Sequence, residues 1–213
     1  MAKARDLKKE NYNVVALIGD GSLSGGEALE GLSNAAVLNS NMIIIVNDNS
    51  MAIAPVEGGI YNSLAILRET KGQAKDNIFK SMGYDYYYVE DGNNVESLIK
   101  TFSKVKDTNK PVVVHIHTLK GKGYEPAEQD KETYHWQLPG FMERAGKVQP
   151  KVETYNTITN DFILSKKKKD SSVIAVSPAT PGATGMTKEF RKQMGANYTD
   201  VGIAEQHAVG YVS

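Results

Sequence analysis

The sequence contains no cysteine among its 213 residues, and its charge shows no excess of either sign. The first absence excludes disulfide bonds and thiolate metal sites. Because 25 basic residues balance 25 acidic ones, no overall field favours nucleic acid or an anionic membrane. The hydrophobic share of 40% is ordinary for a globular protein. We therefore expect a globular protein with no nucleic-acid partner.

Long hydrophobic runs are also missing. The apolar runs are the length of strands, far short of the roughly 20 residues that cross a bilayer, and no signal-peptide pattern opens the chain. We expect a cytoplasmic protein that does not contact membranes. Residues 1–10 resemble the end of a helix, and a parallel sheet beginning at Val14 normally has earlier elements covering both faces. We therefore expect that sequence upstream is missing.

Two short apolar runs, rich in β-branched residues, end abruptly in polar residues. Residues 14–18 end at Asp20 and its flanking glycines, and residues 42–46 end at an Asn-Asp-Asn triplet that closes with Asn49. Apolar residues of the intervening segment 26–39 share one face, as in a helix. A strand–helix–strand crossover makes the two strands parallel and right-handed. Asp20 and Asn49 are therefore predicted at the carboxyl ends of adjacent strands.

These two side chains predict a metal site. A carboxylate and an amide carbonyl are hard oxygen donors of the kind that Mg²⁺ accepts. Glycines 21, 25 and 26 let backbone amides approach phosphate groups where the helix begins. A helix amino end supplies only about half a positive charge, so a diphosphate would need the metal as well. The alternative is an ordinary turn with polar caps.

The spacing of the two motifs resembles a known signature. Gly19-Asp20-Gly21 is followed by Asn47-Asp48-Asn49, with Asn49 lying 29 positions after Asp20. This pattern resembles the thiamine diphosphate signature of transketolase-like enzymes. The resemblance implies a three-layer α/β fold built on a parallel sheet, with Mg²⁺ bound by Asp20, Asn49 and the main-chain carbonyl of Met51. It also implies that Gly21, Ser22, Asn49 and Met51 contact the cofactor.

Further periodic segments predict the rest of this α/β unit. The helices are expected at 62–69, 77–82 and 95–102, and the strands at 84–89 and 112–118. In the third helix, Val95, Leu98, Ile99 and Phe102 form one apolar stripe. His115 and His117 alternate along the last strand, where packed, hydrogen-bonded histidines are favoured over a metal pair. The tyrosines at 86–88 are interpreted as packing residues.

The segment after this strand carries a second informative pattern. Residues 120–136 are expected to form a loop, and exposed lysines such as Lys120 and Lys122 are usually solvated. Their position directly after a strand end favours a ligand-facing role. Lys-Gly-Lys-Gly-Tyr at 120–124, with His135 fifteen positions after Lys120, resembles the 1-deoxy-D-xylulose-5-phosphate synthase branch of this family. The resemblance places Lys120 and His135 at the active site, Lys120 balancing negative charge on cofactor or substrate and His135 moving protons.

A second unit is expected after a linker. Pro and Gly interrupt residues 138–152, so we divide the chain into a domain at 1–137 that binds diphosphate and Mg²⁺, a linker at 138–152, and the start of a similar α/β domain at 153–213. This second unit should contain helices at 154–168 and 188–194 and strands at 172–176 and from 198. In the first of these helices, Ile158, Phe162 and Ile163 are expected to face inward.

The third motif lies in this second unit. Residues 200–208 read Asp-Val-Gly-Ile-Ala-Glu-Gln-His-Ala, which resembles the family segment whose glutamate binds the aminopyrimidine ring of thiamine. The resemblance therefore gives Glu205 a catalytic, cofactor-binding role. A glutamate at a helix start can also act only as a cap. Thr180 departs from the family, which usually has Met there.

Taken over the whole chain, the resemblance implies a transferase that uses thiamine diphosphate and Mg²⁺. The implied reaction condenses pyruvate with glyceraldehyde 3-phosphate, releases CO₂ and supplies isoprenoid and thiamine biosynthesis, in a homodimer. Alternatives are transketolase, another thiamine diphosphate-dependent enzyme that decarboxylates 2-oxo acids, or a non-catalytic fragment. A dinucleotide-binding domain is weaker, because its glycine pattern and distal acidic residue are not placed as required.

Overall fold

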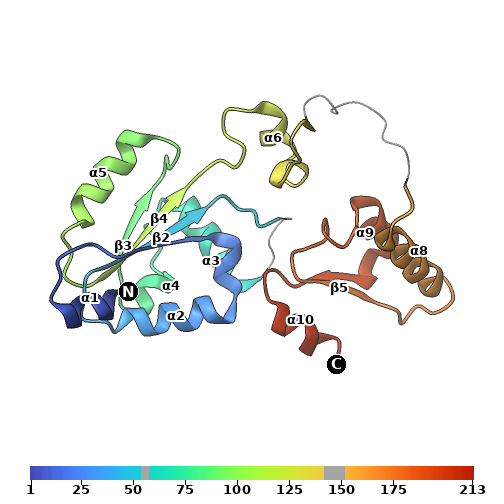
Figure 1. Ribbon diagram of the computed structural model, residues 1–213, viewed down its shortest axis with the longest axis horizontal. Coiled ribbons are helices and arrows are strands. Elements are labelled where there is room, and N and C mark those ends of the chain that lie inside the picture. Colours follow the sequence, from blue (N-terminus) through green and yellow to red (C-terminus); the bar gives the residue numbers. More distant parts are fainter. Residues whose placement is uncertain (54–57, 142–151) are drawn as a thin grey trace.

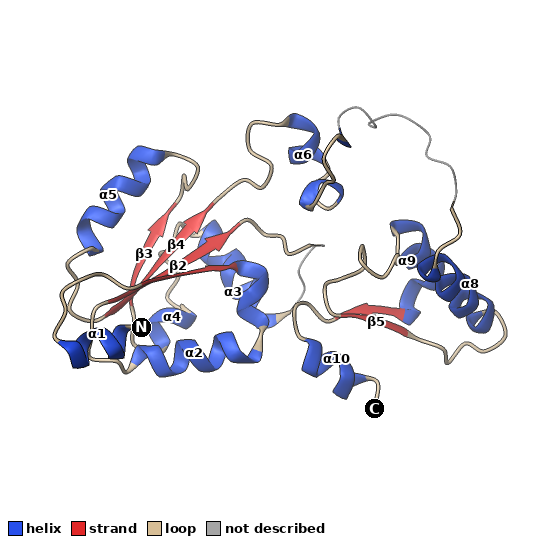
Figure 2. Ribbon diagram, in the orientation of Figure 1, coloured by secondary structure: helices blue, strands red, loops and turns tan. Residues whose placement is uncertain are grey.

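Two parallel β-sheets organise the chain (Figures 1 and 2). The computed structural model describes residues 1–53, 58–141 and 152–213. The first sheet has the order β1-β2-β4-β3, and the second pairs β5 with β6. The strands are β1 (Val15–Gly19), β2 (Met42–Asp48), β3 (Asp85–Val89), β4 (Pro111–His117), β5 (Ala175–Ser177) and β6 (Tyr198–Asp200). The expected α/β class, with a second similar unit, is confirmed.

The register of the first sheet brings its polar strand ends to one edge. All three strand pairs are parallel, with Gly19 of β1 opposite Asn47 of β2, and Asp48 opposite His117 of β4. β2 and β4 are the central strands and consist largely of Val and Ile, which suit a sheet covered on both faces. Residues that follow β1, β2 and β4 therefore meet at the same carboxyl edge.

Helices on both faces of this sheet make three layers (Figure 1). α2 (Gly26–Ala36), α3 (Gly59–Glu69) and α4 (Ile78–Ser81) cover one face, where Leu64, Leu67 and Phe79 are fully buried. Each such side chain contributes roughly 1.5–3 kcal/mol by leaving water. α5 (Val95–Val105) covers the other face, and α1 (Ala2–Lys8) lies before the sheet.

The apolar stripe predicted for α5 is only partly correct. Leu98 and Phe102 pack against the sheet and Val105 is buried, but Val95 and Ile99 are 61% and 59% exposed. A single helix on this face contacts the sheet along a narrow strip, so apolar residues at the flanks of a broad stripe remain in solvent.

The segment after β4 is not the plain loop that was expected. It contains α6 (Glu125–Gln129) and the 3₁₀ turn η2 (Thr133–His135), so Glu125 and Glu128 are helical. Pro126 near the helix start is compatible with helix because the first amides need no partner. Of the predicted linker 138–152, residues 142–151 lie outside the described residues, and the domain division remains a prediction.

The second unit contains α8 (Tyr155–Lys167), α9 (Lys188–Met194), the 3₁₀ turn η3 (Gly195–Asn197) and α10 (Glu205–Tyr211). Thr154 caps α8 by accepting the amide hydrogen of Thr157. The inward face predicted for α8 is wrong in part, because Ile158 and Phe162 are exposed while Ile163 packs in the small core. The two-stranded sheet offers little surface for a helix to cover.

Within the described ranges, no helix combines the length and apolar character needed to span a bilayer.

Candidate functional site

The two predicted metal ligands, Asp20 and Asn49, converge on one backbone amide. Asp20 begins the 3₁₀ turn η1 (Asp20–Ser24) directly after β1, and Asn49 follows β2. The Met51 amide donates to Asp20 Oδ2 at 3.1 Å and to Asn49 Oδ1 at 3.2 Å. One nitrogen therefore joins the carboxylate and the amide oxygen across the sheet edge. The two oxygens lie close enough to act on a single ligand.

A cavity of about 370 Å³ opens over this junction. Its lining combines both strand ends with two more distant segments: residues 19–22, Asn49, residues 51–53, Lys120, His135 and Ile203. Gly21 packs tightly against its opposite wall, because a Cβ placed there would lie 2.7 Å from the Cβ of Ala52. The backbone of the first turn thus comes as close to the 51–53 segment as a glycine permits.

Asp20 carries an unfavourable buried charge. This residue is only 2% exposed. Burial, followed by repulsion from the Asp48 carboxylate, raises the pKa of Asp20 to about 6. Such a carboxylate gains by meeting a cation. Burial removes the water that would stabilise the charged carboxylate, and a divalent ion bound at this position would stabilise that charge instead.

Asp48 has the opposite environment. Burial alone would raise its pKa, but hydrogen bonds from His115 and Arg68 outweigh this effect and lower the pKa of Asp48 to about 2. Arg68 of α3 lies 2.5 Å from Asp48 Oδ2, and His115 Nε2 lies 2.9 Å from the same oxygen. His115 is fully buried and hydrogen-bonded, as the packed-histidine interpretation expected.

The segment after β4 brings Lys120 and His135 to the cavity. Lys120 Nζ donates to the carbonyl of Ala52 at 2.6 Å and lies 3.0 Å from His135 Nδ1. Burial lowers the pKa of Lys120, and burial together with the Lys120 charge lowers the pKa of His135. At neutral pH His135 is thus favoured in its unprotonated form, in which it can accept a proton. His117 does not line this cavity but a neighbouring pocket, which contains Lys122 and shares Asn49 with the cavity.

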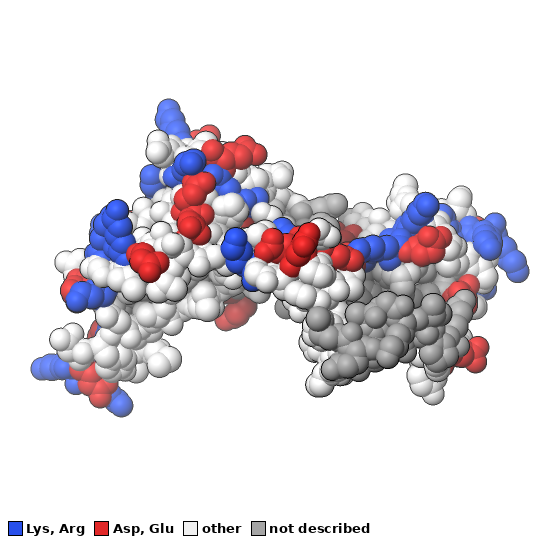
Figure 3. Space-filling model, turned by 90° about the horizontal axis from the view of Figure 1, so that it is seen from above, with Lys and Arg blue, Asp and Glu red and all other residues white. Residues whose placement is uncertain are grey.

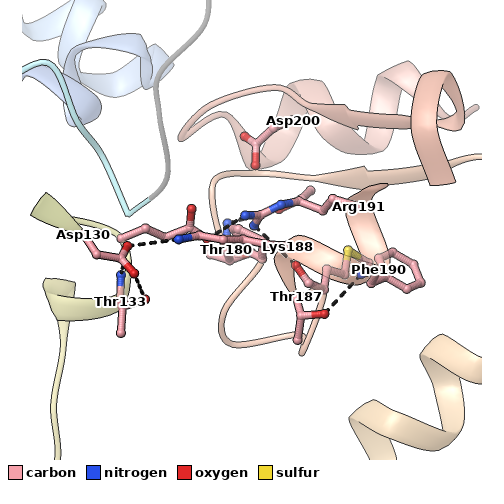
Figure 4. Close-up of polar contacts among 12 residues, drawn as sticks. Asp130, Thr133, Thr180, Thr187, Lys188, Phe190, Arg191 and Asp200 are labelled. Atoms are coloured by element: carbon pink, nitrogen blue, oxygen red, sulfur yellow. Dashed lines mark hydrogen bonds and ion pairs between the residues drawn. The ribbon is translucent and has the colours of Figure 1, made fainter. Parts of the chain in front are cut away.

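Two ion pairs connect the segment that carries His135 to α9 (Figure 4). Figure 4 shows Lys188 directed toward Asp130. Lys188 Nζ lies 3.0 Å from Asp130 Oδ1, and these side chains are 62% and 43% exposed. Arg191 lies 2.7 Å from Glu132, and these side chains are only 18% and 20% exposed. The second pair should therefore be the stronger link, since exposed pairs are screened by solvent.

Glu205 does not line the cavity. It is exposed at the first position of α10, whereas Ile203 contributes to the lining. Ser24 Oγ donates to the Ile203 carbonyl at 3.1 Å, which attaches this loop to η1. The structure therefore brings together Asp20, Gly21, Ser22, Asn49, Met51, Lys120 and His135, but leaves Glu205 outside the group.

Sequence reasoning missed two residues that support the site. Tyr61 of α3 donates to the Gly21 carbonyl at 2.9 Å and contacts Ser24 Oγ at 2.8 Å. Arg68, which pairs with the Asp48 carboxylate, also lies on α3. Neither belongs to a motif. For Arg68, the available signal in the sequence was Asp48, an acidic residue at the end of an apolar strand, because a buried carboxylate requires a positive partner.

No cluster of three His, Cys, Asp or Glu side chains suitable for a metal occurs in the described ranges. The predicted Mg²⁺ site is of another kind, with one carboxylate, one amide and one main-chain carbonyl. On the face of the molecule seen in Figure 3, basic and acidic side chains are interspersed. Lys120 supplies a positive charge at the cavity itself.

Comparison with known proteins gives a consistent match. A family model described as 1-deoxy-D-xylulose-5-phosphate synthase matches residues 1–75 and 68–118. Proteins of that name from Listeria monocytogenes serotype 4b and from Clostridium botulinum strain Eklund 17B are 38% and 37% identical over 98% of this chain. The match covers 36% and 39% of those proteins. A third, from Bacillus cereus strain B4264, is 35% identical over 98% of the chain and 39% of its own length. The chain thus spans about two fifths of the length of these relatives.

Proposed function

The chain belongs to the 1-deoxy-D-xylulose-5-phosphate synthase family, and we propose that it binds thiamine diphosphate with Mg²⁺ at the carboxyl edge of its first sheet. We further propose that the protein condenses pyruvate with glyceraldehyde 3-phosphate, releasing CO₂ and forming 1-deoxy-D-xylulose 5-phosphate for isoprenoid and thiamine synthesis. The supporting observation is that Asp20 and Asn49 meet at one amide within a cavity.

The donor set fits the proposed ion. Asp20, Asn49 and the Met51 carbonyl supply three oxygens of the hard type that Mg²⁺ prefers, leaving positions for phosphate oxygens. Gly21 and Ser22 lie at the first turn after β1, where backbone amides can face a diphosphate. When bound, thiamine diphosphate supplies a nucleophilic carbon and accepts the electrons left by decarboxylation.

Lys120, His135 and Glu205 complete the proposal. Lys120 is held beside the cavity by the Ala52 carbonyl and can balance negative charge on a bound diphosphate or 2-oxo acid. His135, whose pKa is lowered by burial and by Lys120, can accept and return a proton near neutral pH. The role of Glu205, holding the aminopyrimidine nitrogen, rests on the resemblance of residues 200–208.

A second candidate function is cofactor binding without turnover. It is favoured by the position of Glu205, which is exposed and outside the cavity lining. In this case the chain would bind thiamine diphosphate and Mg²⁺ but form no product. The two candidates differ only in catalysis.

Two measurements test these proposals. Titration calorimetry with thiamine diphosphate and Mg²⁺ should give saturable binding that Asp20→Ala abolishes, and absence of binding by the parent chain would refute the site. A product assay with pyruvate and glyceraldehyde 3-phosphate then separates turnover from binding alone. A ketose phosphate in place of pyruvate should give no product, and product from it would indicate a transketolase instead.

We also propose a homodimer located in the cytoplasm, with the domain boundaries predicted above. Sedimentation equilibrium tests the assembly, and limited proteolysis tests the boundaries, because cleavage should concentrate in 138–152.

A further inference from the structure

A buried chain of polar side chains lies directly beneath the candidate site. It begins at the Tyr86 hydroxyl, 2.7 Å from His115 Nδ1, and continues from His115 Nε2 to Asp48 Oδ2 at 2.9 Å. Arg68 reaches the same carboxylate oxygen. A carboxylate only accepts hydrogen bonds, so His115 Nε2 donates to Asp48, while Nδ1 on the other side of the ring contacts the Tyr86 hydroxyl.

The other oxygen of Asp48 holds the turn that carries the metal ligands. Asp48 Oδ1 accepts the Ser50 amide hydrogen at 3.1 Å. Ser50 has a φ of 62°, a left-handed conformation that is uncommon for residues other than glycine. Such a conformation persists where surrounding bonds determine it. The hydrogen bond from the Ser50 amide to Asp48 is one such bond, and Ser50 lies between Asn49 and Met51 in the chain.

We propose that Asp48, together with Arg68, His115 and Tyr86, is a positioning network that holds the 49–51 turn in the shape required to bind the metal–diphosphate group. Arg68 and His115 fix one carboxylate oxygen, so the other remains aimed at the Ser50 amide. The turn then presents Asn49 and Met51 toward Asp20. This inference rests on the proposed function, because the group to be bound is the one proposed above.

The network is built from elements that do not reach the cavity themselves. Arg68 comes from α3, Tyr86 from β3 and His115 from β4, and none of them lines the cavity. They would act on binding through Asp48 and the turn alone. A change in Arg68 or Tyr86 should therefore alter the turn without removing a group that touches the ligand.

Amide hydrogen exchange of the whole 213-residue chain, without metal or cofactor, tests the positioning directly. Arg68→Met should accelerate exchange at Ser50 and Met51 at least tenfold, whereas Arg68→Lys should retain most of the protection. The matched control is Lys71→Met, which removes a nearby, exposed cation that pairs with the exposed Glu90 at 3.5 Å. This control should leave exchange at both amides unchanged.

Titration calorimetry with thiamine diphosphate and Mg²⁺ supplies the second measurement. Arg68→Met should weaken binding at least tenfold, Arg68→Lys by less, and Lys71→Met not at all. If Arg68→Met does not fold, Tyr86→Phe removes only the hydroxyl, and should accelerate exchange and weaken binding about threefold.

The outcomes separate this inference from the proposed function. If the parent chain binds no cofactor, the proposed function fails, while the exchange measurement still decides whether the network holds the turn. A merely structural network would lower the melting temperature in Arg68→Met but leave exchange at Ser50 and Met51, and the dissociation constant, unchanged well below that temperature. That result would overturn the inference.

Discussion

Replacing Asp20 with Asn should stabilise the metal-free protein. Burial and the neighbouring Asp48 raise the pKa of Asp20 from its ordinary 3.8 to about 6. At pH 7 the charged form is therefore disfavoured by about two pKa units, which corresponds to roughly 2 to 3 kcal/mol of folding free energy. Asn has the same shape without the charge, and its amide oxygen can still accept from Met51.

The pH dependence of this effect has a definite sign. The Asp20 charge destabilises the folded state fully above pH 6, and the cost is relieved as pH falls from about 6 to 3.8, because the folded protein takes up the proton first. The advantage of Asp20→Asn should therefore be greatest at pH 7 and shrink toward pH 4. Urea unfolding followed by circular dichroism at several pH values measures this advantage. The comparison requires that parent and variant show the same dependence of the free energy of unfolding on urea concentration.

Asp48→Asn is the matched control, with the opposite sign. The pKa of Asp48 is lowered to about 2, so its charge stabilises the fold at neutral pH, and that stability is lost as pH falls from about 3.8 toward 2. The substitution leaves Arg68 without its carboxylate and should destabilise by about 2 to 5 kcal/mol. The reasoning fails if Asp20→Asn is no more stable than the parent at pH 7, or if its advantage does not depend on pH.

Two further predictions concern the walls of the cavity. Gly21→Ala should weaken thiamine diphosphate binding at least tenfold by calorimetry, because its Cβ would lie 2.7 Å from that of Ala52, whereas Gly26→Ala, with nothing within 4 Å, should have no effect. Equal affinities would contradict this packing argument. Lys120→Met should raise the pKa of His135 toward its ordinary value of 6.5, since the Lys120 charge contributes to lowering it. An NMR titration of the histidine rings checks this shift, and an unchanged His135 titration would exclude the electrostatic coupling.

The strands of the first sheet could be predicted because each of them is marked by a short continuous pattern in the sequence. Runs of Val and Ile that stop at polar residues gave β1, β2 and β4, and a crossover helix between β1 and β2 placed their ends at one edge. Side-chain burial was harder to predict. Ile99 of α5 and Phe162 of α8 fit an apolar stripe but remain exposed, because burial depends on how much sheet lies beneath each helix, and periodicity does not report this.

The candidate site, like the fold, has a part that the sequence predicted and a part that it did not. The meeting of Asp20 and Asn49 followed from chain topology alone. Arg68 and Tyr61 were missed because they lie on α3, whose sequence carries no motif, and they reach the site only after the helix packs on the sheet. Predicting Arg68 would have required asking which cation pairs with an aspartate at the end of a buried strand. Glu205 remains a prediction from resemblance.

The two halves of the candidate site differ in how firmly they are held, and this difference bears on the order in which parts of a ligand bind. The half that contains Asp20 and Asn49 is built on strand ends of a packed sheet, where few rearrangements are possible. The half that contains His135 lies on the short 3₁₀ turn η2 outside the sheet, in a segment that the Asp130–Lys188 and Glu132–Arg191 ion pairs connect to α9. A short turn outside the sheet can adjust at lower cost than strand ends within it. We therefore expect the metal–diphosphate end of the ligand to bind first, to a nearly preformed edge, and the segment carrying His135 to settle around it afterwards.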